Sequence, residues 1–197
     1  MNTFTDDYNE FLRTHEYKTV SVSGHDFMLS DSGSGEQTIV FLNGMDLQQA
    51  WIRLIPALEK HCRIILMKYP VDVEKNAEMA ALLHDLFAKL DIPAPILFGT
   101  SDGGVLAQYY AKKYKAGGLI LLSTLTVDSA YVEAMRKEKF VMPFMRFYVK
   151  RVKFAKLRTM LISAVQKHYR NETEVEKAYA TSFLEQVGTD ESYRRSY

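Results

Sequence analysis

The apolar positions of this chain follow two alternating patterns up to about residue 125. Short unbroken apolar runs, typical of strands buried on both faces of a parallel sheet, alternate with longer stretches whose apolar residues recur every three or four positions, typical of amphipathic helices. Strands at this spacing between helices predict crossover units around a mostly parallel sheet that helices cover on both faces. The predicted strands are 38–42, 63–67, 95–98 and 118–122, and the predicted helices are 50–58, 79–90 and 105–114.

The first 30 residues have a different pattern. Apolar residues recur at helical spacing over 4–14 and predict a short leading helix. Two strand-like runs, 17–22 and 25–30, flank a Ser-Gly turn and predict a β-hairpin. The parallel strands are therefore preceded by an antiparallel pair.

After residue 125 the strand signal stops and the pattern becomes helical. Residues 126–170 contain eleven Lys or Arg and three acidic residues, interleaved with Met and Phe. We therefore divide the chain into a core, residues 1–125, and a C-terminal helical segment, residues 126–197. A basic amphipathic segment of this kind either turns its apolar side chains inward and its Lys and Arg to solvent, or makes weak contact with an anionic membrane surface or takes up an acyl chain, and we favour the first.

Composition and charge exclude several classes of protein. With 197 residues, of which 47% are hydrophobic, the chain can bury a sizeable core, and a formal net charge of +1 gives no reason to expect a nucleic-acid partner. The single cysteine, Cys62, excludes an internal disulfide framework and a Cys-rich zinc site and fits a reducing compartment. The polar N-terminus lacks the apolar stretch of a leader sequence, so we expect a cytoplasmic protein.

One pentapeptide indicates chemistry: Gly99-Thr-Ser-Asp-Gly103, a G-x-S-x-G sequence. It follows a predicted buried strand and opens a predicted helix, the setting in which this motif presents a serine nucleophile, Ser101. The turn is so tight that the residues two before and two after the serine must lack side chains, and Gly99 and Gly103 do. The rival interpretations are a turn with a serine N-cap and a phosphate-binding loop, but the glycine and lysine spacing of phosphate loops is absent.

At these residues, and in order over about 17–123, the sequence resembles the α/β-hydrolase superfamily, with strands one to six of that fold. The resemblance implies an oxyanion hole built from two backbone N–H groups, those of Asp102 and Met45. Met45 follows Asn43-Gly44, where relatives usually have His-Gly. The resemblance also implies that the helical segment is a cap over the pocket, and that acyl transfer proceeds through a Ser101 acyl-enzyme without a metal or an organic cofactor.

The family's acid and histidine have no counterpart in the expected order. They usually follow strands seven and eight, and no strand-like run after Leu122 corresponds to either. Asp128 is a candidate acid, because some family members carry the acid just after strand six, but a helix cap is the favoured alternative. His168, the single histidine after Ser101, is a candidate base, with a solvent-facing helix position as the favoured alternative.

These features support two hypotheses of function. The first is a serine hydrolase of esterase, lipase or thioesterase type that acts on a small hydrophobic ester or thioester and is incomplete as given. The second is a non-catalytic binding or interaction protein on the same scaffold. Without strand seven, residues 118–122 form an uncharged apolar edge, which predicts a homodimer through that edge.

Overall fold

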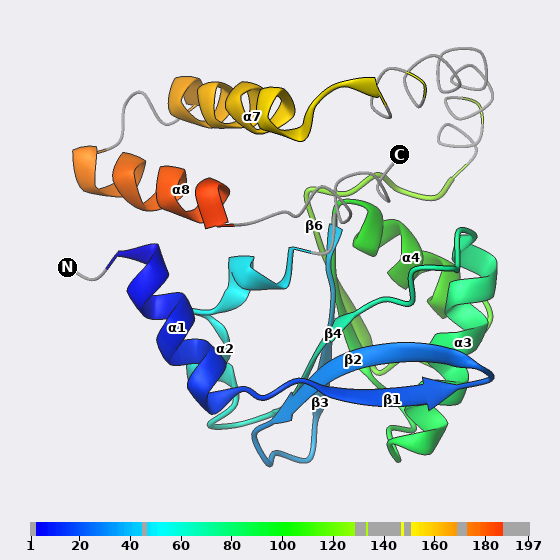
Figure 1. Cartoon of the computed structure of the whole chain (residues 1–197). Coiled ribbons are helices and arrows are strands. Elements are labelled where there is room, and N and C mark those ends of the chain that lie inside the picture. The colour runs from blue at the N-terminus through cyan, green and yellow to red at the C-terminus, as the bar shows by residue number, and fades with distance from the viewer. Residues whose placement is uncertain are drawn as a thin grey trace. The chain divides into compact units, whose positions relative to one another are not determined.

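A computed structural model describes residues 3–44, 47–128, 133, 147, 151–168 and 173–186 (Figure 1), with the backbone alone for Phe154, Leu157, Leu161, Val165 and His168. The chain divides into two compact units. One unit is His15–Arg136, and the other joins Met1–Thr14 to Lys137–Tyr197.

The unit His15–Arg136 is built on a sheet whose six described strands have the order β1-β2-β4-β3-β5-β6. The hairpin strands β1 and β2 pair antiparallel, and β2 pairs antiparallel with β4. The neighbours β4, β3, β5 and β6 are parallel, which confirms the predicted mixed, mostly parallel sheet. The bounds are β1 Lys18–Val22, β2 His25–Ser32, β3 Thr38–Leu42, β4 Arg63–Lys68, β5 Ile96–Thr100 and β6 Gly118–Leu122.

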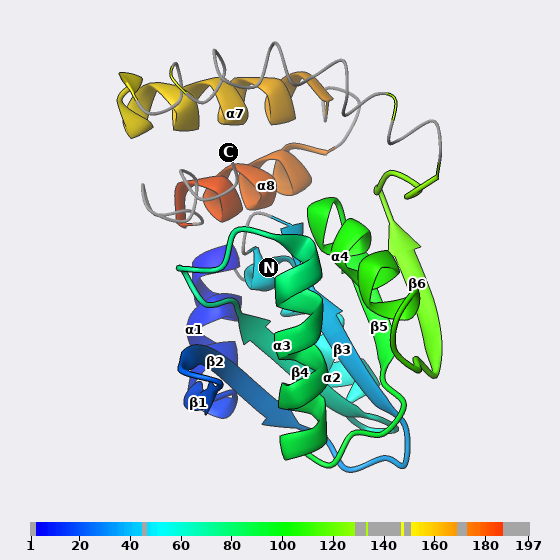
Figure 2. The ribbon, with the colours of Figure 1, turned by 90° about the vertical axis from the view of Figure 1, so that its right-hand side faces the viewer.

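Helices cover both faces of the sheet, because each buried strand presents apolar side chains alternately to either side. On one face, α3 (Asn76–Lys89) and α4 (Asp102–Ala111) bury Val40, Leu42 and Leu97 of the central strands. On the other face lie a 3₁₀ helix, η2 (Gln48–Trp51), and the short helix α2 (Ile55–Leu58). Figure 2 shows α2 and α3 on opposite sides of β3 and β4.

The segment predicted as one helix over 50–58 is in fact two short elements, η2 and α2. Pro56 lies in the first turn of α2. A proline is tolerated there because its missing N–H has no acceptor in the first turn, but a helix that ran through it from further upstream would lose a hydrogen bond and clash with the preceding turn. The chain therefore restarts its helix at Ile55.

The second unit contains three described helices, α1 (Phe4–Thr14), α7 (Phe154–His168) and α8 (Glu174–Gln186). Phe4 is 1% exposed and makes edge-to-face contacts with Tyr179 and Phe183 of α8, at ring-centroid distances of 5.5 and 5.1 Å. The Tyr179 hydroxyl donates a hydrogen bond to Asp7 at 2.9 Å. The predicted leading helix is thus confirmed, and it packs against α8.

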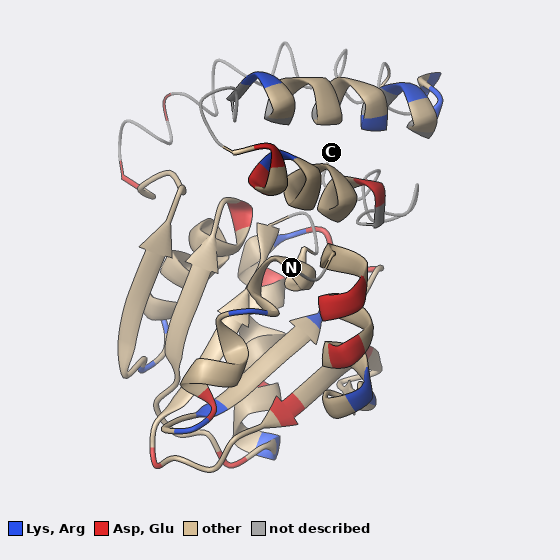
Figure 3. Cartoon of the chain, turned by 90° about the vertical axis from the view of Figure 1, so that its left-hand side faces the viewer, with Lys and Arg blue, Asp and Glu red and all other residues tan. Residues whose placement is uncertain are grey.

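Charge is divided between the C-terminal helices. The described helix α7 has Lys and Arg and no acidic residue, whereas α8 carries acidic residues in its first turn (Figure 3). The basic character predicted for 126–170 therefore continues through α7 and ends before α8. Among the described residues, we find no helix with the length and apolar character that crossing a membrane requires.

Candidate active site

Ser101 lies in a sharp turn between a strand and a helix. The strand β5 ends at Thr100 and α4 begins at Asp102, so one residue makes the connection. Its backbone has φ 52° and ψ −125°, a conformation uncommon for any residue but glycine. Strain of this kind costs of order 1–3 kcal/mol and is typical of functional sites. The predicted strand-turn-helix is confirmed.

The serine side chain is accessible and does not cap the helix. Ser101 is exposed, and although it is the residue before α4 its side chain makes no capping hydrogen bond. The rival interpretation of a serine N-cap is therefore wrong. The hydroxyl stands at the carboxyl edge of the parallel strands, where ligands of open α/β sheets bind.

The two motif glycines are needed because backbone segments approach them closely. A Cβ atom on Gly99 would lie 2.5 Å from the Cα of Gly104, and one on Gly103 would lie 2.0 Å from the carbonyl oxygen of Leu42. Both contacts are to backbone, which cannot move aside as a side chain would. The sequence predicted that positions 99 and 103 must lack side chains, and this close backbone packing is the physical reason.

The backbone of Ser101 is held by the last residue of β6 and by the loop that follows it. Its N–H donates a hydrogen bond to the carbonyl oxygen of Leu122 at 3.2 Å, and its own carbonyl oxygen accepts one from the Thr124 hydroxyl at 2.6 Å. The Thr124 side chain also occupies the space beside Gly104, where a Cβ would lie 2.5 Å from it. The edge strand β6 thus fixes the turn from outside.

The side chain of Gln108 joins this loop to α4. Its amide nitrogen donates to the carbonyl oxygens of Leu125 at 2.8 Å and Gly104 at 3.0 Å, and its amide oxygen accepts from the N–H of Val127 at 2.8 Å. Two of these bonds fix the loop against the helix, and the third holds the side chain on α4 itself. The sequence analysis did not identify Gln108 or Thr124, because neither belongs to a motif. The one feature of the sequence that could have indicated them is their position, in the second turn of α4 and two residues after β6.

The connection after β3 comes close to the nucleophile. A Cβ on Gly44 would lie 2.7 Å from the Cβ of Ser101 and 2.5 Å from a carboxylate oxygen of Asp102, so the chain passes there because the position is glycine. Asp102 is the first residue of α4, where a carboxylate is favoured by the helix dipole. Met45, the other predicted oxyanion-hole residue, lies outside the described residues.

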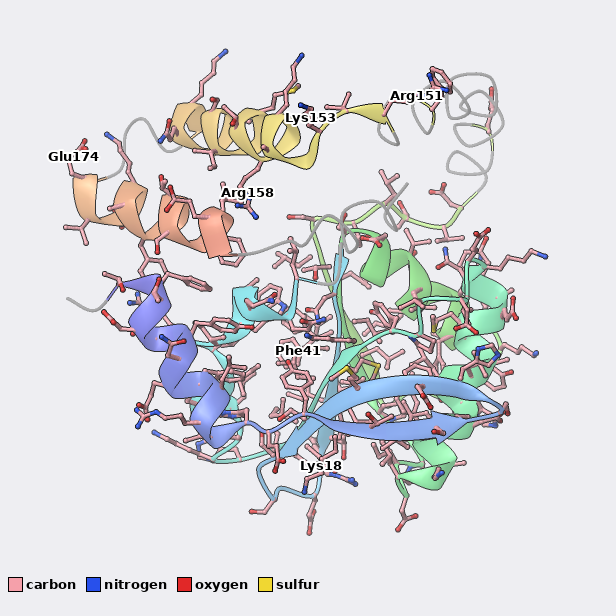
Figure 4. All side chains as sticks on the ribbon, in the orientation of Figure 1. Lys18, Phe41, Arg151, Lys153, Arg158 and Glu174 are labelled. Atoms are coloured by element: carbon pink, nitrogen blue, oxygen red, sulfur yellow. The ribbon has the colours of Figure 1, made fainter. Side chains whose placement is uncertain are left out.

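Aromatic rings form the sheet face below this connection. Trp51 of η2 contacts Phe41 of β3 and Phe98 of β5, with ring-centroid distances of 5.8 and 5.0 Å, and Phe41 stacks on Phe98 at 4.8 Å. Figure 4 shows the Phe41 side chain on the side of the sheet that carries η2 and α2. The indole N–H of Trp51 donates a hydrogen bond to the Oδ1 atom of Asn43 at 2.5 Å. These ring contacts pack η2 against β3 and β5.

No described histidine side chain is hydrogen bonded to the Ser101 hydroxyl. Those of His15 and His25 lie 2.9 Å from carboxylates of Glu59 and Asp72, and that of His84 stacks on Tyr114 at 4.1 Å. His61 precedes β4 and so lies at the opposite edge of the sheet. His168 is the last residue of α7, and its side chain lies outside the described residues.

Asp128, the candidate acid, comes after β6 in the loop that Gln108 holds. It is exposed, and its N–H donates to the carbonyl oxygen of Thr126 at 3.0 Å. The following four residues lie outside the described part, so the predicted role as a helix cap stays a prediction, as does the role as triad acid. Within the described residues, no group of three or more His, Cys, Asp or Glu is placed to hold a metal ion.

Comparison with solved structures identifies the fold as that of the α/β-hydrolases. A hydrolase from Pseudomonas aeruginosa PA01 is 16% identical, with a TM-score of 0.64 over 92% of this chain and 71% of that one. The carboxylesterase CesB from Bacillus subtilis is 15% identical, with a TM-score of 0.63 over 98% of this chain and 69% of that one. The epoxide hydrolase VrEH1 from Vigna radiata is 19% identical, with a TM-score of 0.53 over 59% of this chain and 40% of that one.

The chain therefore has an α/β-hydrolase fold, as its sequence predicted, and at these identities the likeness concerns the fold alone. It spans less than half the length of the epoxide hydrolase. No protein-family model matches the sequence, and no curated protein matches it significantly.

Proposed function

We propose that this protein is a serine hydrolase in which Ser101 is acylated by a small hydrophobic ester or thioester. The observation that carries the proposal is the geometry of Ser101: an exposed serine with φ 52° between a parallel strand and a helix, in contact with the connection after β3. A strained turn of this kind presents a nucleophile at the top of an α/β-hydrolase sheet. The hydrolases among the similar structures, including a carboxylesterase, support the same chemistry.

In the proposed reaction the hydroxyl oxygen of Ser101 attacks the carbonyl carbon of the substrate while its proton passes to a base, the role that the family resemblance gives to a histidine. The negative charge that develops on the carbonyl oxygen is stabilised by the N–H groups of Asp102 and Met45, and each such donor is worth about 3–4 kcal/mol. The carbonyl re-forms as the alcohol or thiol leaves with the proton. Water then attacks the acyl-enzyme and releases the carboxylic acid.

No histidine side chain that the structure describes is hydrogen bonded to the Ser101 hydroxyl, so we expect acylation to be slow. Removal of the triad histidine of a serine protease lowers turnover by about a millionfold, and the rest of the site retains roughly a thousandfold rate enhancement over water. Steady-state turnover of p-nitrophenyl butyrate should therefore be near background, and equal for the wild type, Ser101→Ala and His168→Ala. Fast turnover that both substitutions abolish would show instead that His168 is the base.

The direct test of the nucleophile is a covalent adduct. After long incubation with p-nitrophenyl butyrate, intact-mass and peptide mass spectrometry should show slow addition of one butyryl group at Ser101, and none in Ser101→Ala. Ser123→Ala is the matched control, since Ser123 is also exposed and also has a positive φ, of 48°. An adduct at another residue, or none at all, would contradict the proposal and favour the non-catalytic binding protein.

We also propose a cytoplasmic location, supported by the single cysteine. The proposed substrate class is supported by the half-buried aromatic rings of Trp51 and Phe98, which pack 5.0 Å apart on the sheet face near the connection after β3. For the basic helix α7 we propose a lid with solvent-facing Lys and Arg in preference to weak contact with an anionic membrane surface, because the lid explains the same residues.

A further inference from the structure

The carboxylate of Asp102 lies beside the candidate nucleophile. A Cβ atom on Gly44 would lie 2.5 Å from the Oδ1 atom of Asp102 and 2.7 Å from the Cβ atom of Ser101. The two side chains therefore converge on one point of the connection after β3, and the carboxylate oxygen and the serine Cβ are separated by no more than the sum of these two distances. A negative charge is thus built into the neighbourhood of the reacting hydroxyl.

This charge can act on a ligand. Ser101 and Asp102 are both exposed, so a molecule that reaches the serine hydroxyl at the carboxyl edge of the sheet also meets the carboxylate. At separations of about 5 Å the charge is only partly screened, because the Debye length is about 8 Å at physiological ionic strength. The carboxylate therefore attracts positively charged groups of a bound substrate and repels negative ones.

The side chain of Asp102 has no place in the oxyanion hole. The family resemblance assigns that role to its backbone N–H, which donates, whereas an ionised carboxylate can only accept and carries the wrong sign of charge. The G-x-S-x-G motif also leaves position 102 open, so the turn does not require an acid there. One structural alternative exists, which is the favourable interaction of a carboxylate with the helix dipole at the start of α4.

The surroundings suggest which part of the substrate carries the positive charge. The acyl group is the part proposed to be hydrophobic, in keeping with the half-buried rings of Trp51 and Phe98 near the same connection. A cation is poorly suited to the apolar part of the substrate, since a buried charge without a partner is costly. The charge therefore belongs on the alcohol or thiol that departs, a few bonds from the carbonyl carbon.

We propose that the Asp102 carboxylate is a substrate-binding group that selects esters or thioesters with a hydrophobic acyl group and a cationic leaving alcohol or thiol. The proposal rests on Ser101 being the site of acylation. In the reaction the serine oxygen bonds to the acyl carbon, the bond from that carbon to the departing oxygen or sulfur breaks, and the alcohol or thiol leaves with the serine proton. The carboxylic acid that water later releases is an anion, which the same carboxylate repels.

The test compares two thioesters that have the same shape and differ in charge. One is butyrylthiocholine, and the other is its neutral analogue, in which a tert-butyl group replaces the trimethylammonium group. Both deliver the same butyryl group to Ser101, so intact-mass spectrometry follows one adduct and only the departing thiol differs. The quantity compared is the ratio of the two rates of adduct formation, charged over neutral.

Asp102→Asn should lower this ratio about three- to fivefold, the value of an exposed ion pair. Any difference in the intrinsic reactivity of the two thioesters cancels, because it is the same for wild type and variant. Addition from the neutral analogue should not fall, whereas a purely structural role in the helix would slow both thioesters alike. Asp102→Glu keeps the charge and should retain a ratio above that of Asp102→Asn.

Asp85→Asn is the matched control. Asp85 is an exposed residue of α3, in the half of that helix that returns toward the amino edge of the sheet, so the variant removes the same charge from the same unit away from Ser101. Its ratio should equal that of the wild type. A ratio that Asp85→Asn lowers as much as Asp102→Asn would overturn the proposal, since the net charge of the chain would then be the cause.

Salt gives a second measurement that needs no variant and so holds even if Asp102→Asn fails to fold. Raising NaCl from about 0.1 M to about 1 M shortens the Debye length from about 10 Å to about 3 Å. The wild-type ratio should fall toward that of Asp102→Asn, whose own ratio should change little. A wild-type ratio that does not respond to salt would contradict recognition by charge.

The failure of this proposal can be told apart from failure of the proposed function. If the butyryl adduct forms at Ser101 with the same ratio in wild type and Asp102→Asn, the carboxylate does not select the thiol and the nucleophile stands. If neither thioester nor p-nitrophenyl butyrate gives an adduct at Ser101, the proposed function is wrong and this proposal is wrong with it.

Discussion

The hydroxyl of Thr124 donates a hydrogen bond to the carbonyl oxygen of Ser101 over 2.6 Å, so the loop after the edge strand holds the backbone of the candidate nucleophile. We predict that Thr124→Val, which keeps the shape and removes the donor, lowers the free energy of unfolding by about 1 kcal/mol. It should also slow butyryl addition to Ser101, because the turn is then less well fixed. Urea unfolding and mass spectrometry measure the two effects.

Thr124→Ser serves as the control for that substitution, since it retains the hydroxyl. It should keep the acylation rate close to that of the wild type, with a small loss of stability from the missing methyl group. If the Val and Ser variants acylate equally fast, the hydrogen bond does not position Ser101.

Gly103→Ala should be severely destabilising. The added Cβ would lie 2.0 Å from the carbonyl oxygen of Leu42 and 2.9 Å from the carbonyl carbon of Asn43, and both atoms belong to buried backbone. We expect a loss of more than about 3 kcal/mol in thermal or urea unfolding. Gly24→Ala is the comparison, because nothing lies within 4 Å of its Cβ and only its φ of +86° is unfavourable, which should cost about 1 kcal/mol. Similar losses for both would contradict the packing argument.

The edge strand β6 is proposed as the contact between two copies of the chain. It pairs with β5 on one side, and among the described residues no strand pairs with its other side. Its uncharged residues Leu119 to Leu122 are all exposed. An uncharged apolar edge of this kind is a template for pairing with another chain. We therefore expect concentration-dependent self-association in sedimentation velocity experiments.

Ile120→Lys should reduce that self-association, since a charge on an edge strand opposes pairing. Met28→Lys is the matched control: Met28 is 43% exposed, against 44% for Ile120, but its strand β2 has neighbours on both sides. A wild-type chain that stays monomeric at high concentration, or an equal effect of the two lysines, would refute the proposed contact.

The buried hydroxyl of Tyr110 should lower the free energy of unfolding at alkaline pH. Burial in the core raises the pKa of its hydroxyl from the ordinary value of 10.0 to about 12. The folded state therefore favours the neutral phenol, and its contribution is complete below about pH 10 and is lost as the pH rises towards 12. The loss between pH 8 and pH 11 should be about 1 kcal/mol in urea unfolding, and Tyr110→Phe should remove it. Tyr109→Phe, at the neighbouring half-buried position, should leave the pH dependence in place.

The sequence by itself determined the order of elements and the nucleophile turn. Buried parallel strands leave unbroken apolar runs and amphipathic helices leave a period near 3.6, so β3 and β6 have the bounds that the pattern predicted. The turn at Ser101 was predictable for a local reason, since a strand, two glycines and a helix within a few residues allow one sharp connection. The one helix predicted wrongly, 50–58, failed because Pro56 outweighs the apolar spacing around it.

Only the tertiary structure decided what surrounds that turn. Thr124 contacts Ser101 across 23 positions of sequence, and Asn43 contacts Trp51 across 8, so no periodic pattern reports either contact. The approach of Gly44 to Ser101 and Asp102 is visible only when the connection after β3 is placed against the turn. Side-chain burial and hydrogen bonding between distant segments depend on how the strands pair. The strand order β4-β3-β5-β6 brings β3 and β6 to either side of Ser101, and this order is a property of the folded sheet.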